Sequence, residues 1–273
     1  MESKTDKIEL NMKSKLMSDE EFLNKNYSEP YTYKLKSSNG FELVYFGGNH
    51  TTDVQDPQYP ILSNLWEEFI QGKNPEECLV LLSGGTGYPT NLNLDDAIHQ
   101  GGECNYIAVV AHNNKIRLIA PEPDMHRVNS ELEKQFARDQ IEYYYFARVV
   151  AQWNRFQGID KPNFRWYMEG FLEQDRDESG WVDYDFSIEN MRRVHKQIFG
   201  TEMDENDKEF FDAISNPYSN KSIVNEVGHE ENIIRDENIV REILRYIKNH
   251  NLFIVFGSAH AIVQEKALRD LVK

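Results

Sequence analysis

The hydrophobic pattern of the chain contains one unit twice: a short apolar run, then a glycine, then a histidine three residues later. Residues 252–256 are five consecutive apolar residues, rich in β-branched and aromatic types, and the motif Gly-x-x-His follows at 257–260. Runs this short and this apolar are typical of buried central strands. Residues 42–46 predict a second such strand, and the same motif follows at 47–50.

Strands and helices alternate around these two motifs. Apolar residues at helical spacing predict helices over residues 61–69, before Gly72, and over 261–271. Two further apolar runs, 78–82 and 116–120, predict strands. This alternation predicts an α/β fold with a mainly parallel or mixed central sheet flanked by helices.

The two ends and the middle of the chain differ in character. Residues 1–35 are charged and poorly periodic, and we expect a polar arm with a short helix at 18–23, capped by Ser18 and Glu21. Residues 36–273 are expected to form a single α/β domain in which 130–230 is a helical insertion or cap. Within that insertion the spacing predicts one long helix over 130–157 and shorter ones later. The last long helix is expected to begin near Arg235.

Charge and composition narrow the classes of partner. The chain carries 30 Lys and Arg against 46 Asp and Glu, a formal charge of −16, which would repel a nucleic-acid backbone or an anionic membrane. Cys78 and Cys104 are the only cysteines, too few for a disulfide framework or a thiolate metal cluster. No run of about 18 apolar residues occurs, and the N-terminus lacks a signal-like segment. We therefore expect a cytoplasmic protein with no nucleic-acid or membrane partner.

Candidate site residues gather at the predicted strand ends. An open α/β sheet binds ligands at the carboxyl ends of its strands, which is where both Gly-x-x-His motifs place an imidazole. Glu103 follows two glycines at the predicted start of a helix, where it serves either a site or only the helix dipole. Glu122 stands between two prolines on stiff backbone. The glycine loop at 83–87 lacks the Gly-Lys-Ser/Thr ending of a P-loop, so a nucleoside triphosphate is not expected.

Two other motifs are rejected. Residues 175–183 match the first nine positions of a calcium-binding EF-hand loop, but position twelve, which requires a bidentate carboxylate, is Phe186. The segment beginning at His229 lacks the second histidine that a zinc-protease helix needs.

The paired motifs, a Glu-bearing strand exit and an Arg at the head of the last helix resemble the superfamily of erythromycin esterase, the Tiki and TraB/PrgY proteins and the haem-binding ChaN lipoproteins. The resemblance covers residues 40–125 and 230–270. It implies that one pocket is lined by His50, Glu103, Glu122, Arg235 and His260. Family members often carry a Glu where this chain has Ser83, which leaves open a changed or lost chemistry.

These residues predict a hydrolase of ester or amide type acting on a small or medium-sized substrate. A histidine would activate water, the glutamates would orient it, and Arg235 would hold an anionic group. A divalent metal (Mn, Co or Zn) on His50, Glu122 and His260 is one alternative, and a non-enzymatic haem- or metal-binding protein is another. A third alternative is a scaffold whose histidines only cap helices. The oligomeric state stays open. The expected substrate-binding residues are Gly48, Asn49, Ser83, Gly84 and Ser258.

Overall fold

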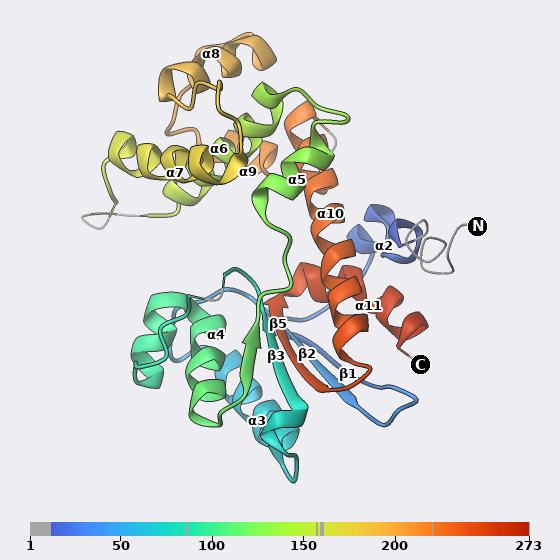
Figure 1. Ribbon diagram of the computed structural model, residues 1–273. Coiled ribbons are helices and arrows are strands. Elements are labelled where there is room, and N and C mark those ends of the chain that lie inside the picture. Colours follow the sequence, from blue (N-terminus) through green and yellow to red (C-terminus); the bar gives the residue numbers. More distant parts are fainter. Residues whose placement is uncertain (1–11, 86, 157, 159–160, 220, 273) are drawn as a thin grey trace. The chain divides into compact units, whose positions relative to one another are not determined.

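A computed structural model describes residues 12–85, 87–156, 158, 161–219 and 221–272. The chain divides into two compact units. The sheet unit comprises Met1–Glu122 and Asp236–Lys273, and the helical unit comprises Pro123–Arg235 (Figure 1). The helical insertion expected at 130–230 falls within the second unit, between the fourth and fifth strands of the sheet.

The sheet unit is built on one five-stranded mixed sheet with the strand order β1-β2-β5-β3-β4. β1 is antiparallel to β2, and the other neighbouring pairs are parallel. The predicted α/β class is therefore confirmed. Gly48 and Gly257, the last residues of β2 and β5, are register partners. The strands are β1 (Tyr31–Lys36), β2 (Glu42–Gly48), β3 (Cys78–Leu82), β4 (Arg117–Ile119) and β5 (Asn251–Gly257).

Helices cover both faces of this sheet (Figure 1). On one face, Phe253 and Val255 pack with residues of α3 (Gln58–Ile70) and α4 (Leu94–Asn113). On the other face, the Tyr45 hydroxyl donates to Gln264 of α11 (Ser258–Leu271) at 2.8 Å. The chain thus leaves β2 toward one face and leaves the adjacent β5 toward the other. Such a switch point opens a crevice at the carboxyl ends of the strands.

The N-terminal segment is more ordered than the expected arm. α2 (Asp19–Leu23) has the predicted capping box between Ser18 and Glu21. Residues 31–36 were expected to belong mostly to the arm, but they form the edge strand β1. The reason is tertiary, because the ring of Tyr33 is buried and stacks on Tyr45 with 5.1 Å between centroids. Residues 1–11 of the arm lie outside the described residues.

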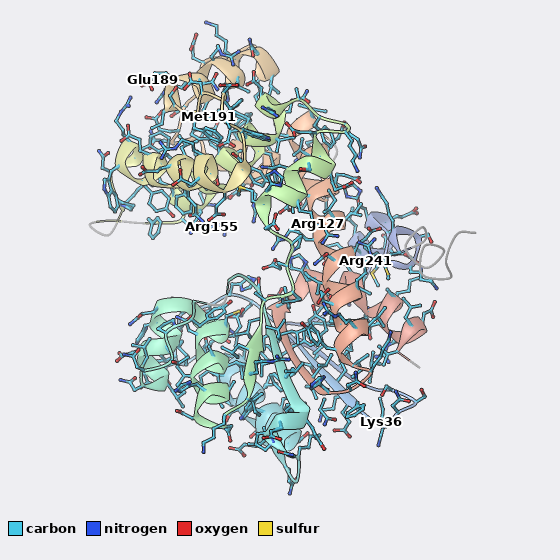
Figure 2. All side chains as sticks on the ribbon, in the orientation of Figure 1. Lys36, Arg127, Arg155, Glu189, Met191 and Arg241 are labelled. Carbon is cyan, nitrogen blue, oxygen red and sulfur yellow. The ribbon has the colours of Figure 1, made fainter. Side chains whose placement is uncertain are left out.

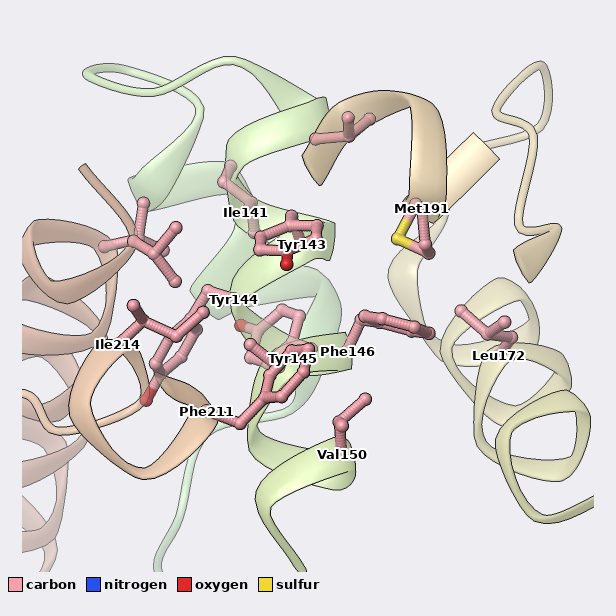
Figure 3. Close-up of a cluster of buried hydrophobic side chains, with 14 of the residues drawn as sticks. Ile141, Tyr143, Tyr144, Tyr145, Phe146, Val150, Leu172, Met191, Phe211 and Ile214 are labelled. Atoms are coloured by element: carbon pink, nitrogen blue, oxygen red, sulfur yellow. The ribbon is translucent and has the colours of Figure 1, made fainter. Parts of the chain in front are cut away.

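The helical unit packs around an aromatic core, which includes Tyr143, Phe146 and Phe211 (Figure 3). The prediction of one helix over 130–157 is wrong, because Ala137 is extended and its N–H donates to Gln140. The last long helix starts at Ile223, well before Arg235. The helices are α5 (Met125–Leu132), α6 (Arg138–Trp153), α7 (Phe164–Ser179), α8 (Ile188–Phe199), α9 (Lys208–Ile214) and α10 (Ile223–Tyr246), which continues into the sheet unit.

The helices also bear on the EF-hand-like motif and on membrane-spanning segments. Residues 175–179 of the EF-hand-like motif belong to α7, so they are not part of a calcium-binding loop. Within the described parts of the chain, no helix combines the length and apolar character needed to cross a bilayer.

Candidate functional site

His50 lies just beyond β2 in an unusual backbone conformation. Its φ is 54°, and in the described part of the chain only Lys115 is another non-glycine residue with positive φ. The side chain is 61% exposed, and Nδ1 lies 2.6 Å from Oε1 of Glu103. Nε2 lies 2.7 Å from the point where a Cβ on Gly257 would stand. The imidazole therefore lies against the end of β5, the strand that carries the second motif.

Glu103 is held by a break in α4. Gly102 has φ +60° and ψ −145°, so the helix is interrupted there and a second helical segment starts at Glu103. This agrees with the predicted first-turn position, although α4 already begins at Leu94. The Glu103 side chain is 1% exposed. A Cβ on Gly48 would lie only 2.8 Å from Oε1, so this buried carboxylate packs directly on the backbone of β2.

Among the residues that the structure describes, His50 is the close ion-pair partner of the Glu103 carboxylate. Neither oxygen accepts a hydrogen bond of normal geometry from any residue that the structure describes. The imidazole of His50 at 2.6 Å is its ion-pair contact. A buried carboxylate without such compensation would be strongly unfavourable, so this contact matters to both side chains.

A second histidine and carboxylate meet on the other face of the sheet. His260, in the first turn of α11, has Nδ1 2.7 Å from Oδ1 of Asp236 on α10. The same Oδ1 accepts a hydrogen bond of 2.6 Å from Gln264, and Asp236 is 2% exposed. The ring of His260 packs edge-on against Phe256, with 5.9 Å between centroids. The sequence analysis missed Asp236. The signal available in the sequence was Gln264, a polar residue that follows the apolar residues 261–263 one turn after His260.

The two histidine–carboxylate pairs flank the switch point. His50 and Glu103 lie on the face covered by α3 and α4, and His260 and Asp236 lie on the face covered by α11. His260 is one helical turn beyond Gly257, the residue that His50 approaches. Each histidine thus has its own acid, and both pairs stand at the carboxyl ends of the adjacent strands β2 and β5.

Glu122 is fixed beside the end of β3. Its Oε2 accepts a hydrogen bond from the backbone N–H of Gly84, and the hydroxyl of Ser83 lies 3.5 Å from the same oxygen. The N–H of Ser83 in turn donates to Val255 of β5 at 3.2 Å. Asn238 of α10 donates to the carbonyl of Pro121 at 2.7 Å, which holds the segment in front of Glu122. Thr86 of this glycine loop lies outside the described residues.

Both Glu103 and Glu122 affect the pKa of the nearby Cys104 thiol. Burial, together with the carboxylates of Glu103 and, more weakly, Glu122, raises the pKa of Cys104 to about 12. Burial also raises the pKa of Tyr88, with contributions from the same two carboxylates. Glu103 and Glu122 therefore act on one neighbourhood, in which Tyr88 donates to the carbonyl of Ser83. At neutral pH this thiol is protonated and is not a nucleophile.

Other predicted residues have structural contacts. Arg235 is the last residue of the helical unit and pairs there with Glu231 at 3.3 Å. The buried hydroxyl of Ser258 donates to the carbonyls of Gly47 and Gly48 at 2.9 and 3.0 Å, so it ties α11 to β2. Asn49 is exposed, and its backbone N–H donates to Gln58 at 3.2 Å.

The set expected to hold a metal, His50, Glu122 and His260, is not assembled as one. Among described residues, no group of three or more His, Cys, Asp or Glu side chains is arranged to hold a metal ion. The donor set therefore does not fit the predicted divalent metal, and we derive no step through one. Comparisons with family models, with characterised proteins and with solved structures find no match to this chain.

Proposed function

We propose that the sheet unit is a hydrolase of ester or amide bonds in which His50 is the general base. The observation that carries this proposal is the contact between an exposed imidazole and a buried carboxylate, 2.6 Å from Nδ1 of His50 to Oε1 of Glu103. A carboxylate in this position orients the ring and stabilises the imidazolium that forms when the ring accepts a proton.

The reaction follows from that arrangement. With Nδ1 of His50 2.6 Å from Oε1 of Glu103, Nε2 accepts a proton from a water molecule while the water oxygen bonds to the carbonyl carbon of the substrate. The bond from that carbon to the leaving oxygen or nitrogen then breaks, and the imidazolium returns the proton to the leaving group. General-base assistance of this kind contributes about 10²- to 10⁴-fold in rate.

Three features of the backbone support a functional reading of His50. Its positive φ is strained for a residue with a side chain, and strain of this kind is concentrated at functional sites. Gly48 and Gly257 leave space for the Glu103 carboxylate and for the His50 ring, where any side chain would collide with them. The histidine also stands at a switch point of the sheet, where open α/β folds bind ligands.

The proposed site also includes Glu122 and the pair formed by His260 and Asp236. The Glu122 carboxylate, held by Gly84, would orient the attacking water or a polar group of the substrate. His260, supported by Asp236, would contact the substrate from the other side of β5.

The test is hydrolysis of p-nitrophenyl esters and anilides of increasing acyl length by the full chain. His50→Gln and Glu103→Gln should each lower the rate by about 10²-fold or more if His50 is the base. His99→Gln is the matched control, because His99 is exposed on α4 and should leave the rate unchanged. Activity that survives His50→Gln at the wild-type level would refute the proposal.

Titration with haem separates the proposal from the carrier alternative that Ser83 favours. Stoichiometric binding with a Soret band that both His50→Gln and His260→Gln abolish, in a protein without hydrolytic activity, would identify a haem-binding protein. Ester hydrolysis without haem binding supports the hydrolase. Restoring the family carboxylate with Ser83→Glu should then raise the rate further.

A further inference from the structure

The helical unit contains a recess of its own, of about 360 Å³, bordered by α6, α7 and the end of α9. Its polar lining includes Arg148, Gln152, Arg155, Asp175 and Ser215, and Phe171 adds an aromatic wall. A recess of this size suits a small molecule, and the proposed hydrolytic residues of the sheet unit are not part of it.

Both arginines line the recess, Arg148 from α6 and Arg155 from the turn that follows this helix. Arg148 and Gln152 are four residues apart on α6, so their side chains emerge on one face of the helix. The N–H of Arg155 donates to the carbonyl of Gln152 at 3.0 Å, and all three side chains line the recess. Arg155 is exposed, and its guanidinium makes no ion pair or hydrogen bond with any residue that the structure describes. Arg148 is 3.7 Å from Glu231, and its guanidinium stands 5.5 Å from the centroid of the Tyr144 ring. Both guanidinium groups therefore keep donors that a ligand can use.

The carboxyl groups at the recess carry less than their full negative charge at neutral pH. Asp175 is 7% exposed and Glu142, behind it on α6, is fully buried. Burial, together with the nearby Glu178 carboxylate, raises the pKa of Asp175 to about 7, although a hydrogen bond with Glu142 and the charge of Arg148 act in the opposite direction. Burial and the Asp175 carboxyl raise the pKa of Glu142 well above its usual range. The two carboxyl groups thus hold at least one proton at neutral pH, and the arginines dominate the charge of the recess.

We propose that this recess binds a small organic carboxylate with an apolar body, held by Arg148 and Arg155. The carboxylate accepts hydrogen bonds from the two guanidinium groups, for which its planar geometry is well matched. Gln152 and Ser215 offer further donors, and a protonated Asp175 offers a hydroxyl. The apolar part of the ligand contacts Phe171 and Val149, which also line the recess.

A monoanion fits these groups better than inorganic phosphate does. Inorganic phosphate is a mixture of monoanion and dianion at neutral pH, and the dianion would stand beside Asp175, which is partly ionised there. The apolar side chains of the recess would also remain exposed to water, because phosphate has no apolar surface to cover them. A carboxylate with an aromatic or aliphatic body satisfies both parts of the lining.

Calorimetric titration of the full chain with benzoate tests this inference. We expect a dissociation constant between about 10 μM and 1 mM, with much weaker binding of neutral benzamide and of phosphate. Arg155→Gln and Arg148→Gln should each weaken benzoate binding about fivefold or more. Arg127→Gln, an exposed change elsewhere in the helical unit, should leave it unchanged; Figure 2 labels both Arg127 and Arg155.

Three outcomes would overturn the inference. These are no benzoate binding up to about 20 mM, equal binding of benzamide, or unchanged affinity in both arginine variants. Circular dichroism establishes that each variant is folded, and Arg155→Gln changes only an exposed side chain if Arg148→Gln proves unstable. Tighter binding of phosphate than of benzoate would reject the carboxylate specificity. These results are independent of ester hydrolysis, so either proposal can fail alone.

Discussion

The imidazole of His50 meets the carboxylate of Glu103 between two elements of the sheet unit, with Nδ1 and Oε1 2.6 Å apart. His50 comes from the segment after β2, and Glu103 comes from the break in α4. The contact requires glycine at two places, Gly48 under the carboxylate and Gly257 under the ring. This contact should affect the rate of hydrolysis, and the other buried carboxyl groups should affect stability.

Gly257→Ala should displace the imidazole of His50 without removing any polar group. The new Cβ would stand 2.7 Å from Nε2, a distance that real Cβ atoms do not keep, so the ring must move. We expect ester hydrolysis to fall by about 10-fold or more, because small errors in the position of a catalytic group have large effects on rate. The rate measurement should be accompanied by a thermal melt.

Gly170→Ala is the matched control for that substitution. Gly170 lies within α7, and nothing stands within 4 Å of an added Cβ. Alanine should therefore leave hydrolysis unchanged and raise the free energy of unfolding by up to about 1 kcal/mol. A Gly257→Ala variant with wild-type activity would show that the position of the ring does not matter to the reaction.

Asp236→Ala should destabilise the sheet unit. Its Oδ1 is the acceptor for both His260 and Gln264, so the substitution leaves two buried or half-buried donors without their acceptor. Losses of this kind amount to about 2–4 kcal/mol of unfolding free energy. Urea denaturation followed by circular dichroism measures the loss. Asp183→Ala, at an exposed position of the helical unit, should change the same quantity by less than about 0.5 kcal/mol.

The carboxyl pair of the helical unit should make stability depend on pH. Folding raises the pKa of Asp175 from 3.8 to about 7 through burial. The pKa of Asp175 is higher in the folded protein than in the unfolded chain. Below pH 3.8 the carboxyl group is protonated in both states, so its burial causes no pH-dependent loss of stability. Stability is therefore lost progressively as the pH rises from 3.8 to about 7, because in this range the unfolded chain has ionised the carboxyl group and the folded protein has not. We expect the melting temperature to fall between about pH 4 and pH 7 and to level off above about pH 7.

Asp175→Asn should remove part of that loss. At about pH 8 the variant should be more stable than the wild type by roughly 2 kcal/mol, and at about pH 5 the difference should shrink. Asp177→Asn, on the exposed side of the same helix, is the control and should keep the wild-type pH dependence. A parallel shift of the Asp175→Asn curve at every pH would contradict the assignment.

Glu103→Gln tests whether the buried carboxylate acts through His50. The amide is nearly isosteric but carries no charge, so it cannot stabilise the imidazolium that forms when Nε2 accepts a proton. We expect kcat for the esters to fall about 10²-fold with a small change in KM, because the loss concerns the transition state. An unchanged kcat in a folded variant would reduce Glu103 to a structural role.

The sequence alone determined much of the sheet and the position of the first histidine. Apolar runs predicted four of the five strands, β2, β3, β4 and β5. The signal is plainest in β2, β3 and β5, because a strand buried on both faces must be apolar throughout. The two Gly-x-x-His motifs placed both histidines after strands, and the glycine pair before Glu103 marked a helix start. These are local signals, readable within about ten residues.

Only the tertiary structure decided the partners of those residues and the limits of several helices. Asp236 was not identified as the partner of His260, because that contact depends on how α10 and α11 pack. β1 was missed because its stability comes from pairing with β2 and from the stack of Tyr33 on Tyr45. The break at Ala137 interrupts a continuous apolar periodicity, since periodicity reports which residues are buried and not where the backbone changes direction.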